Sequence, residues 1–188
     1  MRLVRFVLPA LLLAAPLHAA ESTGSGKWTI GPNLGFSVLS STENVPSSFG
    51  FGSPTAGGPI FGTLQPGLRI GSIASGGTLE IYLDTGMNFT HSAGNSFYAL
   101  LNTLNVQRNF SSQAATTPFV TAGGGFATIG DSGDNETHPI FGLGFGLRHR
   151  VSDGHGVVRA ELRYDRFSGT GSSLNSIGVK SGVDLLLH

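Results

Sequence analysis

Charged residues that could form ion pairs occupy every second position in one late segment of the sequence. Arg159, Glu161, Arg163 and Asp165 alternate in sign as they follow one another. A spacing of two places side chains on one face of a β-strand, because successive side chains of a strand point to opposite sides. Guanidinium and carboxylate groups on a shared face can neutralise one another. The spacing therefore predicts a set of ion pairs along one face of a sheet.

Residues that could bind a metal are present but scattered. The histidines that follow residue 20 are His91, His138, His149, His155 and His188. No two of them have the spacing of a zinc site, and the sequence has no cysteine, which excludes thiolate ligands and disulfides. Asp131, Asp134 and Glu136 could hold a divalent cation, although a solvated acidic loop is the favoured interpretation. We therefore expect no metal site and no cofactor.

The elements that must position the charges are segments of alternating polarity. Eight segments alternate, or nearly alternate, between apolar and polar residues: 28–39, 60–70, 78–89, 97–108, 118–129, 140–151, 157–167 and 176–188. In the last one, Val179 and Val183 lie on the face opposite Lys180 and Asp184. The fifth segment is rich in glycine and leaves its inward and outward positions ambiguous. This period of two predicts strands rather than helices.

The N-terminus has the layout of a secretory signal peptide. Arg2 and Arg5 precede an apolar run from Phe6 to Leu17, and small residues follow at Ala19 and Ala20. We expect residues 1–20 to be a signal peptide, cleaved after Ala19 or Ala20, and residues 21–188 to form one domain. Residues 21–188 have a formal charge of −2, from nine basic and eleven acidic residues, which gives no reason to expect a nucleic acid partner.

Together these patterns predict an all-β fold, an eight-stranded antiparallel up-and-down transmembrane β-barrel. An even number of strands places both ends of the barrel on one side, with turns at 71–77, 109–117 and 152–156. Loops at 40–59, 90–96, 130–139 and 168–173 then lie on the other side. The alternative is a soluble secreted barrel that turns its apolar face inward and binds an apolar ligand. A charged content of only 12% favours the membrane, because a lipid-facing surface excludes charge.

In this orientation the polar face lines a narrow interior. The residues predicted to form a charge network there are Arg69, Glu80, Asp84, Arg148, Arg150, Arg159, Glu161, Arg163, Asp165, Lys180 and Asp184. A symmetric turn at 71–77 would place Arg69 opposite Glu80 and Gln65 opposite Asp84. The expected partners on later strands are Arg148 or Arg150 for Glu161, Arg159 or Arg163 for Asp184, and Asp165 for Lys180.

Three segments resemble the second half of the outer-membrane β-barrel domain family, which includes OmpA-, OmpX- and opacity-type barrels. They read Pro118-Phe-Val-Thr-Ala-Gly-Gly-Gly125, Phe141-Gly-Leu-Gly-Phe-Gly-Leu-Arg148 and Arg159-Ala-Glu-Leu-Arg-Tyr164. The resemblance implies a non-enzymatic protein of the outer membrane with a structural role or a role in surface contact. It implies as partners outer-membrane lipid, lipopolysaccharide, the outer-membrane assembly machinery and an unknown surface partner. Such barrels usually end in an aromatic residue, whereas this sequence ends Leu185-Leu-Leu-His188.

One segment is similar to the motif of the outer-membrane lipid A deacylases, Arg-Tyr-x-His-x-Ser-Asn. Here the sequence reads Arg163-Tyr-Asp-Arg-Phe-Ser-Gly169. The likeness makes Ser168 a candidate nucleophile, but Arg166 replaces the histidine that would accept its proton, and a serine without a base is a poor nucleophile. A lipid A hydrolase is therefore the enzymatic alternative. Arg166 itself is a candidate contact for a lipopolysaccharide phosphate, because guanidinium groups bind phosphate well.

Overall fold

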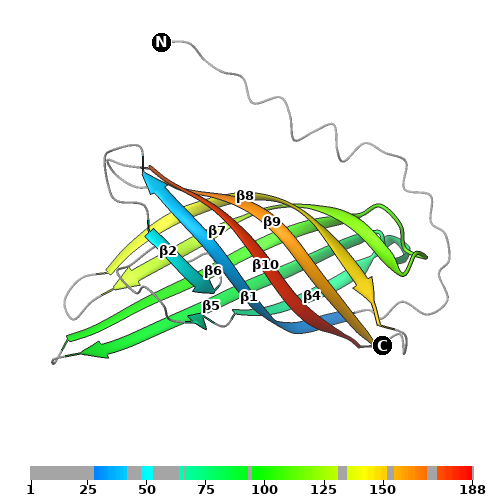
Figure 1. The fold of residues 1–188 in the computed structure, drawn as a ribbon, viewed down its shortest axis with the longest axis horizontal. Helices are drawn as coiled ribbons and strands as arrows, with labels where there is room; N and C mark the ends of the chain where they lie inside the picture. The colour runs from blue at the N-terminus through cyan, green and yellow to red at the C-terminus, as the bar shows by residue number, and fades with distance from the viewer. Residues whose placement is uncertain are drawn as a thin grey trace, which may run out of the picture.

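The computed structural model describes residues 28–41, 48–52, 64–65, 67–92, 95–130, 135–151, 155–168 and 173–187. The predicted signal peptide, residues 1–20, lies outside these ranges. The strands, drawn in Figure 1, are β1 (Trp28–Ser41), β2 (Ser48–Gly52), β3 (Leu64–Gln65), β4 (Gly67–Ala74), β5 (Leu79–Ser92), β6 (Asn95–Asn109), β7 (Thr116–Gly130), β8 (Asn135–Arg150), β9 (Gly156–Ser168) and β10 (Ser173–Leu187). Within the described residues, no helix is long and apolar enough to cross a membrane.

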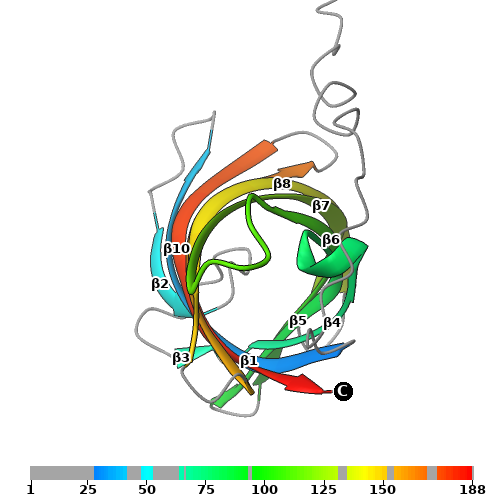
Figure 2. The same ribbon diagram turned by 90° about the vertical axis from the view of Figure 1, so that its right-hand side faces the viewer.

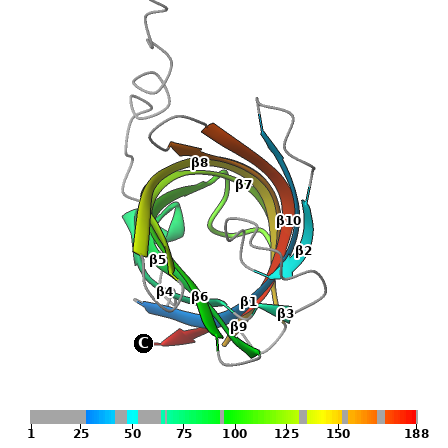
Figure 3. The same cartoon turned by 90° about the vertical axis from the view of Figure 1, so that its left-hand side faces the viewer.

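Eight of these strands form a closed antiparallel barrel. From β4 to β10, consecutive strands pair with one another. β1 pairs with β4 on one side and with β10 on the other, which closes the ring. Figures 2 and 3 show the ring from its two ends. The predicted eight-stranded barrel is therefore confirmed.

The paired residues climb as they pass around the ring. A row of partners that starts at Thr29 passes through Tyr82, Asn105 and Asp165 and returns to β1 at Leu39, ten residues further along. With a rise of about 3.3 Å per residue and a strand spacing of about 4.8 Å, this shift tilts the strands by roughly 40° from the barrel axis. The oblique course of the strands is visible in Figure 1.

One end of the barrel holds Trp28, where β1 begins, and Leu187, where β10 ends, and we call it the terminal end. A 3-10 turn, η1 (Ser75–Gly77), joins β4 to β5 there, with left-handed φ angles of 50° at Ser75, 63° at Gly76 and 91° at Gly77. The connection between β6 and β7 projects across the barrel opening in both end views (Figures 2 and 3). We call the opposite end the loop end.

The β4–β5 hairpin turns later than the sequence analysis predicted. β4 continues to Ala74, and Arg69 pairs with Asp84 instead of Glu80. The predicted register, including Gln65 opposite Asp84, is therefore wrong by four residues. The cause is the tight η1 turn, which begins only at Ser75, so that residues 71–74 belong to the strand.

A short additional strand lies at the loop end, where a loop over residues 40–59 was predicted. β1 pairs with β4 from Trp28 to Asn33, and with β2 from Phe36 to Leu39. β2 also pairs with β3 in parallel. β2 thus fills the space where β1 separates from the β3–β4 strand, and the loop prediction is wrong at residues 48–52.

The structure also settles the glycine-rich strand β7. Phe119 is completely buried and Thr121 is 4% exposed, whereas Phe126 is 60% exposed. Odd-numbered residues of β7 therefore point into the barrel and even-numbered residues point outward, in agreement with strand alternation.

Candidate functional site

Among the residues that the structure describes, ten charged side chains of opposite signs form ion pairs in the interior of the barrel. The five basic residues are Arg69, Arg148, Arg159, Arg163 and Lys180, and the five acidic residues are Glu80, Asp84, Glu161, Asp165 and Asp184. All ten side chains are buried, apart from a slightly exposed Arg148, at 11%. Formal charges on the two sets cancel, which is the condition for burying so many ions in a small volume. We call this group the interior network.

One part of the interior network surrounds Glu80 near the terminal end. The Arg69 guanidinium lies 2.7 Å from a Glu80 oxygen, which also accepts a 2.7 Å hydrogen bond from the Thr29 hydroxyl. The second Glu80 oxygen lies 3.7 Å from Arg148 Nη1. Arg69 also donates to Gln107 at 2.9 Å, and its guanidinium carbon lies 3.5 Å from the centre of the Tyr82 ring. Glu80 is therefore held by groups from β1, β4 and β8.

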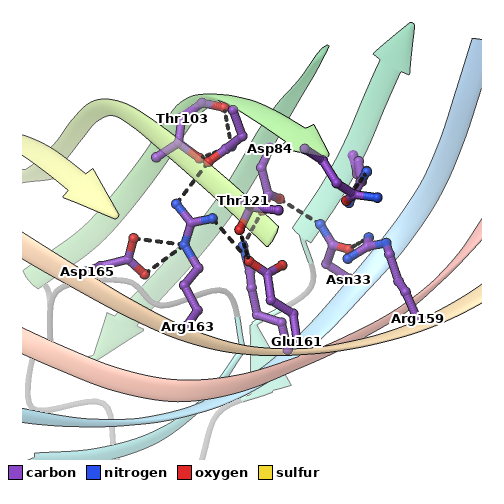
Figure 4. Close-up of polar contacts among 12 residues, drawn as sticks. Asn33, Asp84, Thr103, Thr121, Arg159, Glu161, Arg163 and Asp165 are labelled. Atoms are coloured by element: carbon purple, nitrogen blue, oxygen red, sulfur yellow. Dashed lines mark hydrogen bonds and ion pairs between the residues drawn. The ribbon is translucent and has the colours of Figure 1, made fainter. Parts of the chain in front are cut away.

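A second part joins one ion pair between the neighbouring strands β9 and β10 to contacts between strands that are not neighbours in the sheet. Arg159 Nε donates to Asp184 at 2.7 Å, and Arg159 Nη2 donates to the side chain of Asn33. Asn33 in turn donates to Asp84 at 2.6 Å, and Lys180 forms an ion pair with the other oxygen of Asp84. Figure 4 shows Asn33 between Arg159 and Asp84. These contacts cross the barrel from β9 and β10 to β1 and β5.

The third part is centred on Arg163. Its Nε donates to both oxygens of Asp165, at 2.8 and 3.0 Å (Figure 4). Its Nη2 donates to Asn105 at 2.9 Å. Nη1 lies 3.5 Å from Glu161, which also accepts a 2.5 Å hydrogen bond from Thr121. Arg163 thus uses three of its nitrogens within the interior network.

Glycines on the inner face of β8 leave room for these carboxylates. A Cβ atom on Gly142 would overlap Asp165, and one on Gly144 would overlap Glu161. The alternation of glycine with Phe141, Leu143 and Phe145 therefore has a cause on each face of the strand. The inner face must be small, and the outer face is large and apolar.

The predicted partners of the charged residues agree with the structure only in part. Arg69 contacts Glu80 despite the shifted register, because its long side chain extends toward the terminal end, where Glu80 lies opposite Ile73. Asp184 pairs with Arg159, one of the two partners proposed for it.

Two of the predicted interactions, and the placement of Arg150 in the interior, are wrong. Lys180 pairs with Asp84 across the barrel, not with Asp165. Glu161 contacts Arg163 on its own strand, not Arg148 or Arg150, because Gly146 lies opposite it on β8. Arg150 is only half-buried and donates to the backbone carbonyl of Ser112 at 3.2 Å, so the structure places it at the terminal end, apart from the interior network.

Apolar side chains also point into the barrel, which alternation of charged residues did not reveal. Leu101, Ala127, Ile140 and Phe167 form a buried cluster, each no more than 2% exposed. They come from the loop-end halves of β6 to β9, and we call them the apolar cap. On each strand they occupy the same alternate positions, odd or even, as the charged or polar residues that point inward. This alternation was the signal that could have identified them. The interior of the barrel is therefore filled by two chemically different layers, the charged interior network and the apolar cap.

The outer face is apolar over most of its height. Leu143 is 64% exposed, Leu104 59% and Leu162 57%. Aromatic side chains mark both edges, with Trp28 and Phe110 at the terminal end and Phe126, Phe141 and Tyr164 nearer the loop end. This is the arrangement of an apolar band between two interfacial aromatic girdles.

Residues proposed for chemistry lie at the loop end without an assembled active site among the described residues. Ser168 is half-buried as the last residue of β9 and lies opposite Ser173, and Arg166 is exposed on the outer face. Glu136 forms a 3.2 Å contact with His138, while Asp131 and Asp134 lie outside the described residues. In the part of the chain that the structure describes, no three potential metal ligands come together.

Comparison with known proteins supports the architecture. No family model and no curated protein matches the sequence. Neisserial surface protein A is similar over 88% of this chain and 100% of its own, with a TM-score of 0.63 and 16% identity. The N-terminal barrel domain of Pseudomonas aeruginosa OprF matches 84% of this chain and 98% of its own at a TM-score of 0.47 and 15% identity. Ail of Yersinia pestis matches 85% of this chain and 99% of its own, with a TM-score of 0.45 and 12% identity. The likeness to neisserial surface protein A shows that this chain has the fold of the small eight-stranded outer-membrane barrels.

Proposed function

We propose that this protein is a non-enzymatic barrel of the outer membrane, with a sealed interior and a structural or surface-contact role at its loop end. The observation that carries the proposal is the combination of an apolar outer band with a buried, electrically balanced interior. In a soluble barrel these two faces would be exchanged. A lipid bilayer is the solvent that suits this outer surface.

The dimensions support a membrane-spanning arrangement. β8 has 16 residues. At about 3.3 Å per residue and a tilt of roughly 40°, it extends about 40 Å along the barrel axis, more than the roughly 30 Å hydrocarbon core of a bilayer. The aromatic girdles then lie near the two membrane surfaces. In outer-membrane barrels with an even number of strands, the first strand begins and the last strand ends on the periplasmic side, which assigns the loop end of this protein to the outside.

The filled interior favours a structural role for the barrel and disfavours a role as a channel. Arg69, Tyr82 and Phe119 are each no more than 1% exposed, so large side chains occupy the space that a pore would need. Eight-stranded barrels have interiors just wide enough for side chains to fill. Surface contact is then left to the connections at the loop end, which include the long segment between β1 and β3.

The absence of a base beside Ser168 in the sequence motif supports a non-enzymatic role. The lipid A deacylase motif has a histidine where this chain has Arg166, and a guanidinium group does not accept a proton at physiological pH. Mass spectrometry of lipid A from cells with and without the protein tests this point. Loss of an acyl chain only in cells with the protein would overturn the non-enzymatic assignment.

The membrane proposal is tested by cell fractionation and by gel mobility. We expect the protein in the outer-membrane fraction, soluble only with detergent, and migrating faster before boiling than after it. Release without detergent would contradict membrane insertion. Planar-bilayer recordings of the purified protein should show no steady large conductance, and such a conductance would contradict the sealed interior.

A further inference from the structure

Two charged residues interrupt the outer face of the described strands. Among the outward-facing positions that the structure describes, the charged residues are Arg108 on β6 and Arg166 on β9. Arg108 comes just before the terminal-end connection that contains Phe110, and Arg166 is two residues from the loop end of β9. Each arginine therefore lies at one edge of the apolar band. Arginines at such edges keep their charged groups at the membrane surface, where lipid headgroups lie.

The surroundings of Arg166 provide more than a charge. Phe141 on β8 and Asn175 on β10 are its direct neighbours in the sheet. The Tyr164 hydroxyl donates to Asn175 Oδ1 at 2.7 Å, which holds the amide group and leaves its Nδ2 as the donor end. Ser168 follows two residues after Arg166 on the same face of β9. A guanidinium, an amide and a hydroxyl thus share the outer surface at the loop end.

Below these donors the surface is apolar. Phe141 is 62% exposed, Ile177 59% and Leu162 57%, and each lies on one of the three strands that carry or flank Arg166. A ligand that fits both parts has an anionic head at the level of Arg166 and acyl chains that run down the barrel wall. Phosphate is the anion that a guanidinium binds with paired hydrogen bonds.

We infer that Arg166, Asn175 and Ser168 form a binding site for a phosphate of lipid A in the outer leaflet, with the acyl chains of that lipid packed on Phe141 and Ile177. The inference rests on the proposed membrane orientation, which places the loop end in the leaflet where lipopolysaccharide is found. Arg108 faces the opposite leaflet and does not take part. The site binds lipid and requires no reaction of Ser168.

Native mass spectrometry of the folded protein in detergent tests the site. The probes are bisphosphoryl lipid A, the same lipid A after enzymatic dephosphorylation, phosphatidylethanolamine and inorganic phosphate. We expect retention of bisphosphoryl lipid A, and at least tenfold weaker retention of the dephosphorylated form, the loss of about one charge-assisted hydrogen bond. Millimolar inorganic phosphate should not displace the lipid, because it lacks the acyl contacts. Equal retention of the dephosphorylated lipid or of phosphatidylethanolamine would overturn the inference, as would displacement by phosphate.

Variants then assign the binding to Arg166. Arg166→Gln should weaken retention of bisphosphoryl lipid A about tenfold, and Arg166→Lys should weaken it less, because the charge remains while the paired geometry is lost. Arg108→Gln is the matched control and should bind as the unaltered protein does. Equal binding by Arg166→Gln, or an equal loss in Arg108→Gln, would overturn the assignment.

Gel mobility before and after boiling separates this inference from the proposed function. If Arg166→Gln does not fold, the comparison of phosphorylated and dephosphorylated lipid A on the unaltered protein still decides the question. Failure of the unaltered protein itself to fold in detergent or insert into bilayers would count against the membrane proposal. Normal folding with indifference to the phosphate would count against the lipid site alone.

Discussion

Arg159 and Asp184 form a diagonal ion pair between β9 and β10, with 2.7 Å between Arg159 Nε and an Asp184 oxygen. The residue directly opposite Arg159 is Gly182, on which a Cβ atom would come within 2.7 Å of Arg159 Nη2. The pair is therefore possible because a glycine leaves the space through which the guanidinium reaches its partner.

Removal of one charge from this pair should strongly destabilise the barrel. Asp184→Asn leaves the buried Arg159 without its closest counterion, and we expect the free energy of unfolding to fall by about 3–5 kcal/mol. Urea titration of the protein in lipid vesicles, followed by the fluorescence of the single tryptophan, Trp28, measures the change. The double variant Arg159→Met with Asp184→Leu removes both charges and should lose less. A double variant that is as unstable as Asp184→Asn would contradict this account.

The close approach of β6 and β7 at Gly125 should exclude any side chain there. A Cβ atom on Gly125 would overlap the backbone oxygen of Asn102 and come within 2.7 Å of Thr103 Cα. Gly125→Ala should lower the free energy of unfolding by about 1–3 kcal/mol, because the backbone must move. Gly156→Ala is the control, since its nearest atom would be 3.4 Å away. The same urea titration compares them, and equal stability of the two variants would be evidence against the packing at Gly125.

A charge on the outer band should impair insertion. Leu143→Arg places a guanidinium where Leu143 is 64% exposed on the apolar face, at an expected cost of about 2–4 kcal/mol near the bilayer centre. The yield of the fast-migrating folded form in unboiled gels measures the effect. Gln113→Arg, in the exposed connection between β6 and β7, should fold normally. Equal folding of both variants would contradict the assignment of the outer face to lipid.

The apolar cap should contribute more to the stability of the barrel than to the sealing of its interior against ions. Phe167→Ala should cost about 3–5 kcal/mol in the free energy of unfolding, because it opens a cavity in a buried cluster. Planar-bilayer conductance should stay unchanged, since Arg163 and Asp165 still fill the barrel. Phe141→Ala, on the outer face of β8, is the control and should cost much less. A large steady conductance in Phe167→Ala would show that the cap alone closes the interior.

Salt should have little effect on the stability of the folded barrel. The carboxylates of Asp84 and Asp184 are no more than 3% exposed, so mobile ions cannot approach them to screen their interactions. Urea titrations in dilute and in molar sodium chloride should give midpoints that differ only by the general effect of salt on apolar burial. Asp184→Asn, which lacks one charge of the network, serves as the comparison. A large loss of stability at high salt, confined to the unaltered protein, would indicate exposed ion pairs.

Alternation of residue types was enough to predict the barrel and the eight strands that form it. It failed at the β4–β5 hairpin because register depends on the exact position of the turn. A symmetric turn over residues 71–77 was predicted, whereas the turn is confined to the Ser75-Gly76-Gly77 end of that range, where glycines mark it. β2 was missed for a related reason. Its five residues pair with β1 only where β1 has separated from β4, which is a property of the folded ring.

Pairing partners in the interior could be predicted only where they lie on neighbouring strands. Asp184 and Arg159 are neighbours of this kind. Lys180 and Asp84 belong to β10 and β5, which meet only across the barrel. Apolar positions such as Ile140 and Phe167 were overlooked because polar interiors were expected, although both share the parity of inward residues.

The contacts that cross the barrel have a consequence for assembly. Asp84 receives Lys180 from the last strand, and Arg159 reaches Asn33 on the first, so neither can complete its contacts in an open sheet. A partly formed wall would hold these ions in a low-dielectric environment without their partners, which is strongly unfavourable. Final zippering of β1 onto β10 therefore completes the electrostatics and the cylinder in a single cooperative step.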